Sequence, residues 1–330
     1  MGLFDLFGKK KKGPRVKINI SIPTASDLEA QADARAREMA KLNAECRKSE
    51  HGLTVSQILL LEYCKKGKYP NPEGGYQRFW WFEYGIKSVG NVLKQMETDG
   101  FIRIAQPTDL LSSLKTDELK SILSSLQLTT TGKKADLVER IKQNADNDQL
   151  KSMIHSDKYT LTELGERELA ANAYVPYLHT HKIPELSVWD VNKNANPKHW
   201  RDYIWGKLNK CSMEYASNGQ WGLYRNVRLS MAQFLSEESR YKDAFAMYGE
   251  VCFYDVNGIE HSIDYDDPSD LLYESILVSM KKLAKEAGLT EDQMREILKK
   301  RVEDCLPVKR RVPQGQMTDL ILKRMDSIKA

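Results

Sequence analysis

Hydrophobic positions near the start of the chain repeat first at every second residue and then with a helical period. Residues 16–24 alternate apolar and polar side chains, as a half-buried strand does (Val16, Ile18, Ile20 and Ile22). The alanine-rich, charged segment that follows predicts a helix with a thin apolar stripe, capped by Ser26 or Asp27. We therefore expect a strand and a helix over residues 16–49.

Two further helices are predicted before residue 100. The first covers residues 53–66 and should end at Gly67. The second should end at Gly100, because its apolar positions recur at helical spacing up to that glycine (Val89, Val92, Leu93 and Met96). Between the two helices, a loop rich in Pro and Gly leads into the aromatic segment 78–85, which predicts a short strand or a turn.

A strand follows over residues 101–106, and residues 158–172 predict a strand, a turn and a helix capped by Thr162. The segments "VLKQMETDGFIRI" and "KYTLTELGERELAAN" resemble the two halves of a winged-helix domain, which would cover residues 50–175. The family implies a helix that runs into a strand and a wing that returns through a second strand.

Two departures from the winged-helix pattern are visible. The span 84–100 has room for one full helix only, so the usual helix-turn-helix pair is compressed or altered. The hairpin is also interrupted by about 50 residues, from Pro107 to Asp157. We therefore expect an inserted module in the wing.

The insertion has the leucine pattern of two short helices joined by a polar loop. One apolar face precedes the loop (Leu119, Ile122, Leu123 and Leu126), Leu128 lies in the loop, and a second face follows (Leu137, Val138 and Ile141). "LLSSLKTDELKSILSSLQLTTTGKKADLVERIKQN", residues 110–144, resembles a SAP domain, including the entry into its second helix at residues 131–134. The resemblance implies a helix–extended loop–helix module, expected over residues 108–147, with a nucleic-acid-binding or protein-binding role.

The C-terminal half is expected to begin with a loop-like connector over residues 176–215, rich in Pro, Asn and aromatic side chains. Residues 221–258 are similar to one tetratricopeptide-type helix pair. A single pair is not stable alone, so it should pack on the helices that follow and form an all-helical domain over residues 216–330. By analogy, this domain would bind a protein partner or self-associate. The fold class is thus mainly α with small β.

Charge is unevenly distributed over the 330 residues. The net charge is +4, but residues 1–17 alone carry +5 and the remainder about −1, so anion binding must come from local patches. Residues 1–15 are expected to be a basic tail, either solubilising or a weak amphipathic anchor. No apolar run reaches membrane-spanning length, and the five cysteines are odd in number and widely spaced. We expect a cytoplasmic protein without disulfides.

The loop of the insertion contains several groups that can bind phosphate. A helix N-terminus offers unpaired N–H groups, glycine permits close approach, and lysines add mobile positive charge. The candidate DNA contacts of the module are Lys120, Thr131, Gly132, Lys133, Lys134 and Arg140, with Thr129, Thr130 and Lys142 as possible extensions. The alternative is a structural loop in which Thr131 caps the second helix, since residues 110–144 carry six basic and four acidic side chains, a net +2.

The winged-helix part could add contacts from Lys87 and Lys94, on the polar side of its recognition helix, and from Arg78 and Arg103 on flanking strands. A solvated face is the alternative. Base stacking by Trp80 or Trp81 is disfavoured, since one of two adjacent strand residues usually points into the core.

Metal sites are not expected. The histidines at 179, 181 and 199 offer too few ligands at this spacing. The acidic segment 258–270 is expected to be a loop in which Ser269 or Asp270 caps the next helix. The basic segment 307–316 could be a second patch or a linker. No cofactor motif and no catalytic set assemble, so an enzyme is not expected.

Two hypotheses remain. The first is a non-enzymatic DNA-binding protein whose C-terminal helices recruit a partner. Its short apolar–lysine start and its SAP-like module resemble uncharacterised proteins of bacteria, phages and mobile elements. The second is a protein-interaction adaptor that binds no nucleic acid. The deciding feature is whether the basic side chains of the module and of the winged-helix part share one face, free of Asp117, Glu118 and Glu139.

Overall fold

Helices dominate the structure, a computed structural model that describes residues 25–70, 75–154, 157–183, 185–257, 267–306 and 311–328. Within these ranges the sheet consists of one antiparallel pair of strands, so the mainly α fold with small β is confirmed. None of the helices described is both long enough and apolar enough to span a bilayer. The predicted strand over 16–24 and the N-terminal tail lie outside the described residues.

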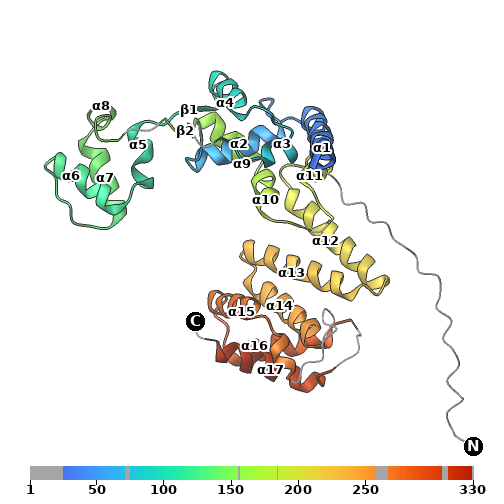
Figure 1. Ribbon diagram of the computed structural model, residues 1–330. Helices are drawn as coiled ribbons and strands as arrows, with labels where there is room; N and C mark the ends of the chain where they lie inside the picture. Colours follow the sequence, from blue (N-terminus) through green and yellow to red (C-terminus); the bar gives the residue numbers. More distant parts are fainter. Residues whose placement is uncertain are drawn as a thin grey trace, which may run out of the picture.

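The first body of the molecule has the strand pair at the edge that faces the insertion (Figure 1). Its helices are α1 (Ala25–Glu45), α2 (Val55–Lys65), α3 (Phe79–Phe82), α4 (Val89–Thr98), α9 (Glu163–Ala171), α10 (Tyr174–Thr180) and α11 (Val188–Asn194). Gly67 and Gly100, both with positive φ, follow α2 and α4 as predicted. The prediction for the start of α1 was wrong, because the helix begins at Ala25 and includes both proposed caps, Ser26 and Asp27.

The two strands that the sequence predicted on either side of the insertion pair with each other. Strand β1 (Ile102–Ile104) runs antiparallel to β2 (Tyr159–Leu161), with Ile102 opposite Leu161 and Ile104 opposite Tyr159. Thr162 caps α9, and its Oγ1 accepts a hydrogen bond from the Gly165 amide at 3.2 Å. The winged-helix likeness of this body stays a prediction.

The aromatic segment near residue 80 is helical, which corrects the expected strand or turn. Trp80 lies in α3 and is 1% exposed, and its Nε1 donates to the Tyr69 hydroxyl at 2.6 Å. The turn after α3 passes so close to α1 that a Cβ on Gly85 would collide with the backbone of Ala40. Burial of the indole and this close approach fix a helical turn where β propensity alone favours a strand.

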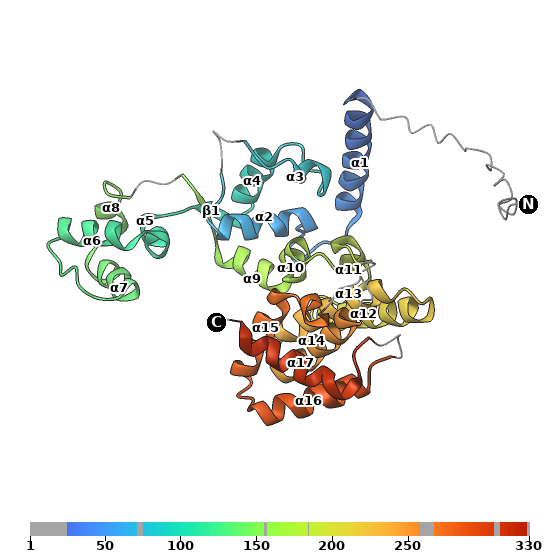
Figure 2. The same ribbon diagram turned by 60° about the horizontal axis from the view of Figure 1, so that its bottom comes forward.

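The insertion forms a separate module with its own core. It comprises α5 (Pro107–Leu110), the 3-10 turn η1 (Leu111–Ser113), α6 (Thr116–Ser125), α7 (Lys134–Asn144) and α8 (Asn147–Leu150). The apolar faces predicted for its two main helices meet in this core, which continues to Leu150 and Ile154 and is distinct from the main one. Figures 1 and 2 both show the module at one end of the molecule, beyond the strand pair.

The C-terminal part is a stack of helices centred on α14. Its elements are α12 (Trp200–Ser217), α13 (Trp221–Glu237), α14 (Tyr241–Val256), the 3-10 turn η2 (Pro268–Leu271), α15 (Glu274–Glu286), α16 (Glu291–Glu303) and α17 (Gln314–Ser327). The predicted pair α13–α14 packs on the helices that follow, as expected. Its tetratricopeptide likeness stays a prediction.

The predicted connector over 176–215 is largely helical, and the loop expectation was wrong. It contains most of α10, all of α11 and most of α12. Several of its apolar side chains, including Leu178, Val188 and Ile204, are buried in one cluster that continues from the first body into the C-terminal helices. Short amphipathic helices separated by Pro and Asn thus join the two parts through a shared core.

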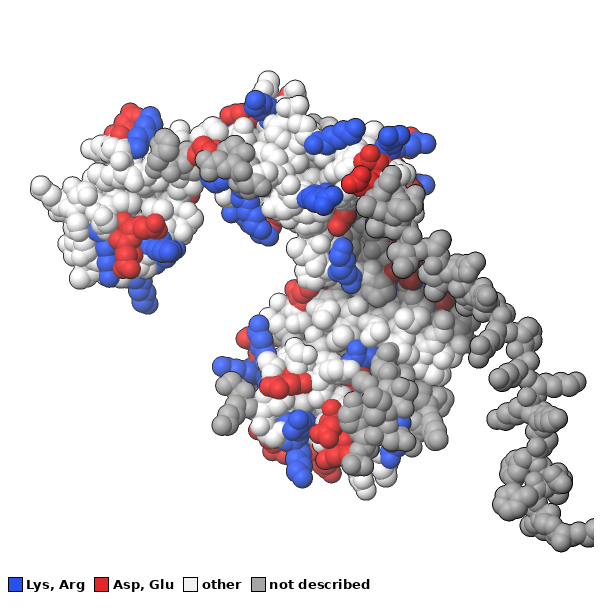
Figure 3. Space-filling view, in the orientation of Figure 1, with Lys and Arg blue, Asp and Glu red and all other residues white. Residues whose placement is uncertain are grey.

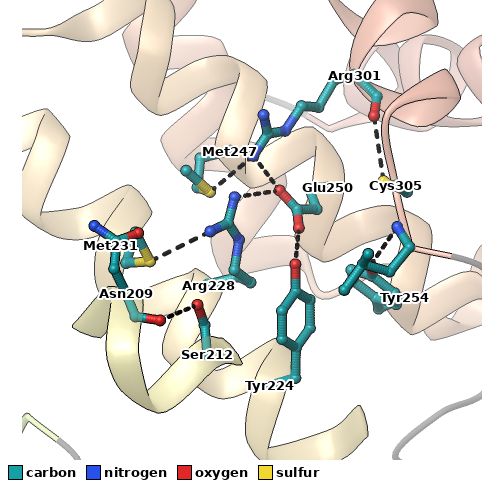
Figure 4. A network of polar contacts seen from close by, with 11 residues as sticks. Asn209, Ser212, Tyr224, Arg228, Met231, Met247, Glu250, Tyr254, Arg301 and Cys305 are labelled. Carbon is teal, nitrogen blue, oxygen red and sulfur yellow. Dashed lines mark hydrogen bonds and ion pairs between the residues drawn. The ribbon is translucent and has the colours of Figure 1, made fainter. Parts of the chain in front are cut away.

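Charged side chains are buried between the C-terminal helices (Figure 4). Glu250 on α14 is 2% exposed and accepts hydrogen bonds from Tyr224 at 2.9 Å and from Arg228 at 2.8 Å, both on α13. Arg301 on α16 reaches the same carboxylate. A buried carboxylate is stable only when it is paired and hydrogen-bonded, so this network fixes which faces of the three helices meet.

We predict that Glu250→Gln destabilises the protein by about 3 to 5 kcal/mol, because two guanidinium groups then share no counter-charge in a buried site. The free energy of unfolding is measured by urea denaturation followed by circular dichroism. The matched control is Asp319→Asn, which removes an exposed carboxylate paired with Arg295 and should cost at most about 1 kcal/mol. Equal losses in the two variants would show that the buried network is not stabilising.

Candidate nucleic-acid interface

The loop between α6 and α7 is shaped by a glycine and an aspartate. Gly132 adopts φ +129°, and the next residue, Lys133, occupies the N-cap position of α7 without a capping hydrogen bond from its side chain. The backbone amide of Lys133 donates to Asp136 Oδ2 at 2.9 Å. The cap is therefore at Lys133 and not at Thr131, which corrects the alternative role proposed for that threonine. An acid three residues after a cap is the sequence signal that could have located this helix start.

Arg140 holds the loop from inside and does not project from it. Its Nη1 donates to the backbone oxygens of Thr129 at 2.6 Å and of Thr131 at 3.0 Å. The guanidinium is half-buried over these carbonyls. The structure thus places this predicted DNA contact in a bracing position, where it sets the shape of the loop.

The lysines of the module remain open to solvent. Lys120 on α6 and the adjacent Lys133 and Lys134 are exposed, as are Thr131 and Gly132. Among the side chains that the structure describes, no ion pair involves any of these three lysines. Their positive charges are therefore free to meet an external anion. Acidic side chains lie nearby, and the module in Figure 3 shows red among blue on the visible face.

Arg103 is paired at the entrance of the module. From β1 its Nη1 and Nη2 donate to the two carboxylate oxygens of Asp109 at 2.6 and 3.1 Å. Burial opposes the charge of Asp109, but the hydrogen bonds from Arg103 and from the Gln106 amide outweigh it and lower the pKa of Asp109. Asp109 was missed by the sequence reasoning, because its partner lies on the strand and the pairing depends on the path between them.

The other basic side chains that the sequence offered as DNA contacts do not lie around the loop. Lys94 is exposed on α4. Lys87 lies in the turn before α4 and not on that helix, and its Nζ lies 4.9 Å from the centre of the Trp81 ring. Arg78 precedes α3 and covers the Phe82 ring. In both views α3 and the module lie at different ends of the first body (Figures 1 and 2). The basic side chains near α3 and those of the module therefore do not form one continuous face.

Trp80 and Trp81, the two tryptophans considered for base stacking, both make contacts within the protein. Trp80 is in the core, and Trp81 Nε1 donates to Asp33 on α1 at 3.3 Å. His179 contacts the hydroxyls of Tyr63 at 3.2 Å and of Tyr84 at 2.9 Å, and burial lowers its pKa. These contacts account for residues that the sequence had offered as stacking or metal candidates.

In the described part of the acidic segment, from residue 267 onward, the capping residue differs from the one predicted. Asp267 caps η2, and its side chain accepts from the Ser269 amide at 2.8 Å. The next helix, α15, starts at Glu274 and is not capped by Ser269 or Asp270. Residues 258–266, and residues 307–310 of the basic segment, lie outside the described residues. All five cysteines are free thiols, as predicted.

Comparison with known proteins finds one family. Residues 110–145 match the model of the SAP domain, so the chain contains a SAP domain where the sequence resemblance placed it. No curated protein and no solved structure matches the chain. The match covers the module that carries the exposed lysines and the braced loop.

We predict that Arg140→Ala loosens the loop without unfolding the module. Loss of the two hydrogen bonds from a charged donor should lower the local opening free energy by about 1 to 2 kcal/mol. Amide hydrogen exchange over residues 126–133 should then be roughly 5 to 30 times faster. Lys142→Ala, an exposed change on the same helix, is the control. Unchanged exchange in Arg140→Ala would contradict the bracing role.

Proposed function

We propose that this protein binds DNA through the SAP module, without catalysis of its own, in the cytoplasm. The exposed pair Lys133 and Lys134, at the start of α7 and beside a glycine turn, is the observation that carries the proposal. The family match supports nucleic-acid binding in general. The preference for DNA is our inference from the two lysines and the helix N-terminus, which together suit a phosphate backbone.

The expected binding mode is electrostatic and weakly sequence-selective. Lys120, Lys133 and Lys134 contact phosphates, and the exposed Thr131 adds a hydroxyl donor. Arg140 keeps the loop in the shape that presents them. Lys94 is too separate to be assigned to the same contact, and Arg103 is already neutralised by Asp109. A small set of phosphate contacts gives modest affinity with a clear salt dependence.

The adaptor role is the second candidate, and two observations favour it. The module mixes acidic and basic side chains on one visible face (Figure 3), and the basic side chains of the first body do not lie beside its loop. The C-terminal helices also expose apolar side chains, with Met213 on α12 71% exposed and Leu223 on α13 45% exposed. These helices would bind a protein partner or a second copy of the chain in either case.

We predict that Lys133→Glu/Lys134→Glu abolishes DNA binding or weakens it more than tenfold. Fluorescence anisotropy of a labelled duplex, titrated with the intact protein at several salt concentrations, measures this. The slope of log K against log salt should become less steep by about 1.8, since two phosphate contacts are lost. Labelled single strands and duplex RNA, titrated alongside, define the class of nucleic acid.

The matched control is Lys299→Glu/Lys300→Glu, which makes the same charge change at adjacent exposed lysines on α16. It should leave the affinity nearly unchanged. If the two double variants bind equally well, the loop is not the phosphate site. If the intact protein binds no nucleic acid at low salt, DNA binding is wrong and the adaptor role stands.

A further inference from the structure

A histidine and two glutamates meet where the turn after α1 touches α9. Glu50 and His51 lie in that turn, and Glu168 projects from α9. One potential ligand atom from each residue lies within 4.8 Å of the other two. The residues come from segments more than 100 positions apart, so folding alone assembles the cluster.

The carboxylate of Glu168 is only half satisfied by the protein. Its side chain is 2% exposed, and Oε1 lies 2.7 Å from His51 Nδ1. Oε2 is buried and has no hydrogen-bond partner among the described residues. A buried polar atom without a partner costs about 1 to 3 kcal/mol, and more when the group is charged. The contact with His51 accounts for one oxygen and leaves the other unexplained.

We propose that Glu50, His51 and Glu168 form a binding site for a divalent transition-metal ion of the zinc type. An imidazole nitrogen with carboxylate oxygens is a donor set that Zn²⁺ accepts, whereas Mg²⁺ and Ca²⁺ prefer oxygen ligands alone. Two carboxylates and a neutral imidazole carry a charge of −2, which balances the ion. Glu50 and His51 are exposed, so water can complete the coordination.

Only small movements are needed to admit the ion. Tetrahedral ligands at zinc distances lie about 3.3 Å from one another. The His51–Glu168 contact must therefore widen slightly and Glu50 must approach. Glu50 and His51 are exposed and so have room to move, whereas Glu168 is buried. The bound ion would use the orphan oxygen and clamp the α1–α2 turn onto α9.

The test uses the untagged full chain, stripped with a chelator and titrated with ZnCl₂ by isothermal calorimetry. We expect one equivalent to bind, and Glu166→Gln to bind as tightly as the unchanged protein. Glu166 is on the same helix but forms an exposed pair with Lys65, so it controls for charge. His51→Gln and Glu168→Gln should bind at least tenfold more weakly, with circular dichroism checking that each is folded.

Titration with Co²⁺ in place of Zn²⁺ shows whether cysteines bind the metal, because thiolate ligands give an intense near-ultraviolet charge-transfer band that nitrogen and oxygen ligands do not. We expect no such band from the stoichiometric site. Its appearance would assign the metal to the free cysteines and overturn the proposal. Affinity that is unaltered in His51→Gln, or zinc binding no tighter than magnesium binding, would also overturn it and leave a plain His–Glu contact. Because His51 is exposed, its variant keeps the test decisive if Glu168→Gln does not fold.

Discussion

The pairing of β1 with β2 is the constraint on which the rest of the first body depends. More than 50 residues separate Ile104 from Tyr159, yet the two lie opposite each other. For an unstructured loop, each doubling of length adds about 0.6 kcal/mol to the cost of closure. Here the intervening chain folds around its own core, and its ends are held together. Asn147 of α8 accepts from the Thr108 amide and hydroxyl of α5 at 3.1 and 2.9 Å.

The same constraint explains how the SAP domain can be displayed without distorting the body that carries it. Because the module's core is separate from the main core, its packing does not rely on the helices around the strands. The Arg103–Asp109 pair ties β1 to α5 at the junction, so the charge of that arginine contributes to geometry and not to an outward field. The first body therefore orients the module, while the module's own residues determine the chemistry of the loop.

The sequence predicts local patterns well and tertiary neighbours poorly, and the SAP domain shows both outcomes. Leu119, Leu123 and Leu137 were placed correctly because their spacing alone defines two helix faces. The hydrogen bonds of Arg140 to the carbonyls of Thr129 and Thr131 were not predicted, because these oxygens become its acceptors only when the loop folds back over it. Its spacing along the chain does not distinguish this arginine from the lysines beside it. Burial of one of the two adjacent tryptophans was expected and Trp80 is buried, but the helical turn that contains it was not predicted, because the core around it comes from distant segments.

The division of work between arginine and lysine follows from their chemistry. The rigid guanidinium can donate to two carbonyls or to both oxygens of one carboxylate, so the arginines at 103, 140 and 228 are used to fix structure. The ammonium of lysine is a mobile, hydrated point charge, and Lys133 and Lys134 keep theirs in solvent. A loop whose backbone is held by Arg140 and whose lysines are exposed suits contact with phosphates, which carry no sequence information. Counting basic residues along the chain therefore overestimates the positive charge that is free to meet an external anion, because several basic side chains have internal partners.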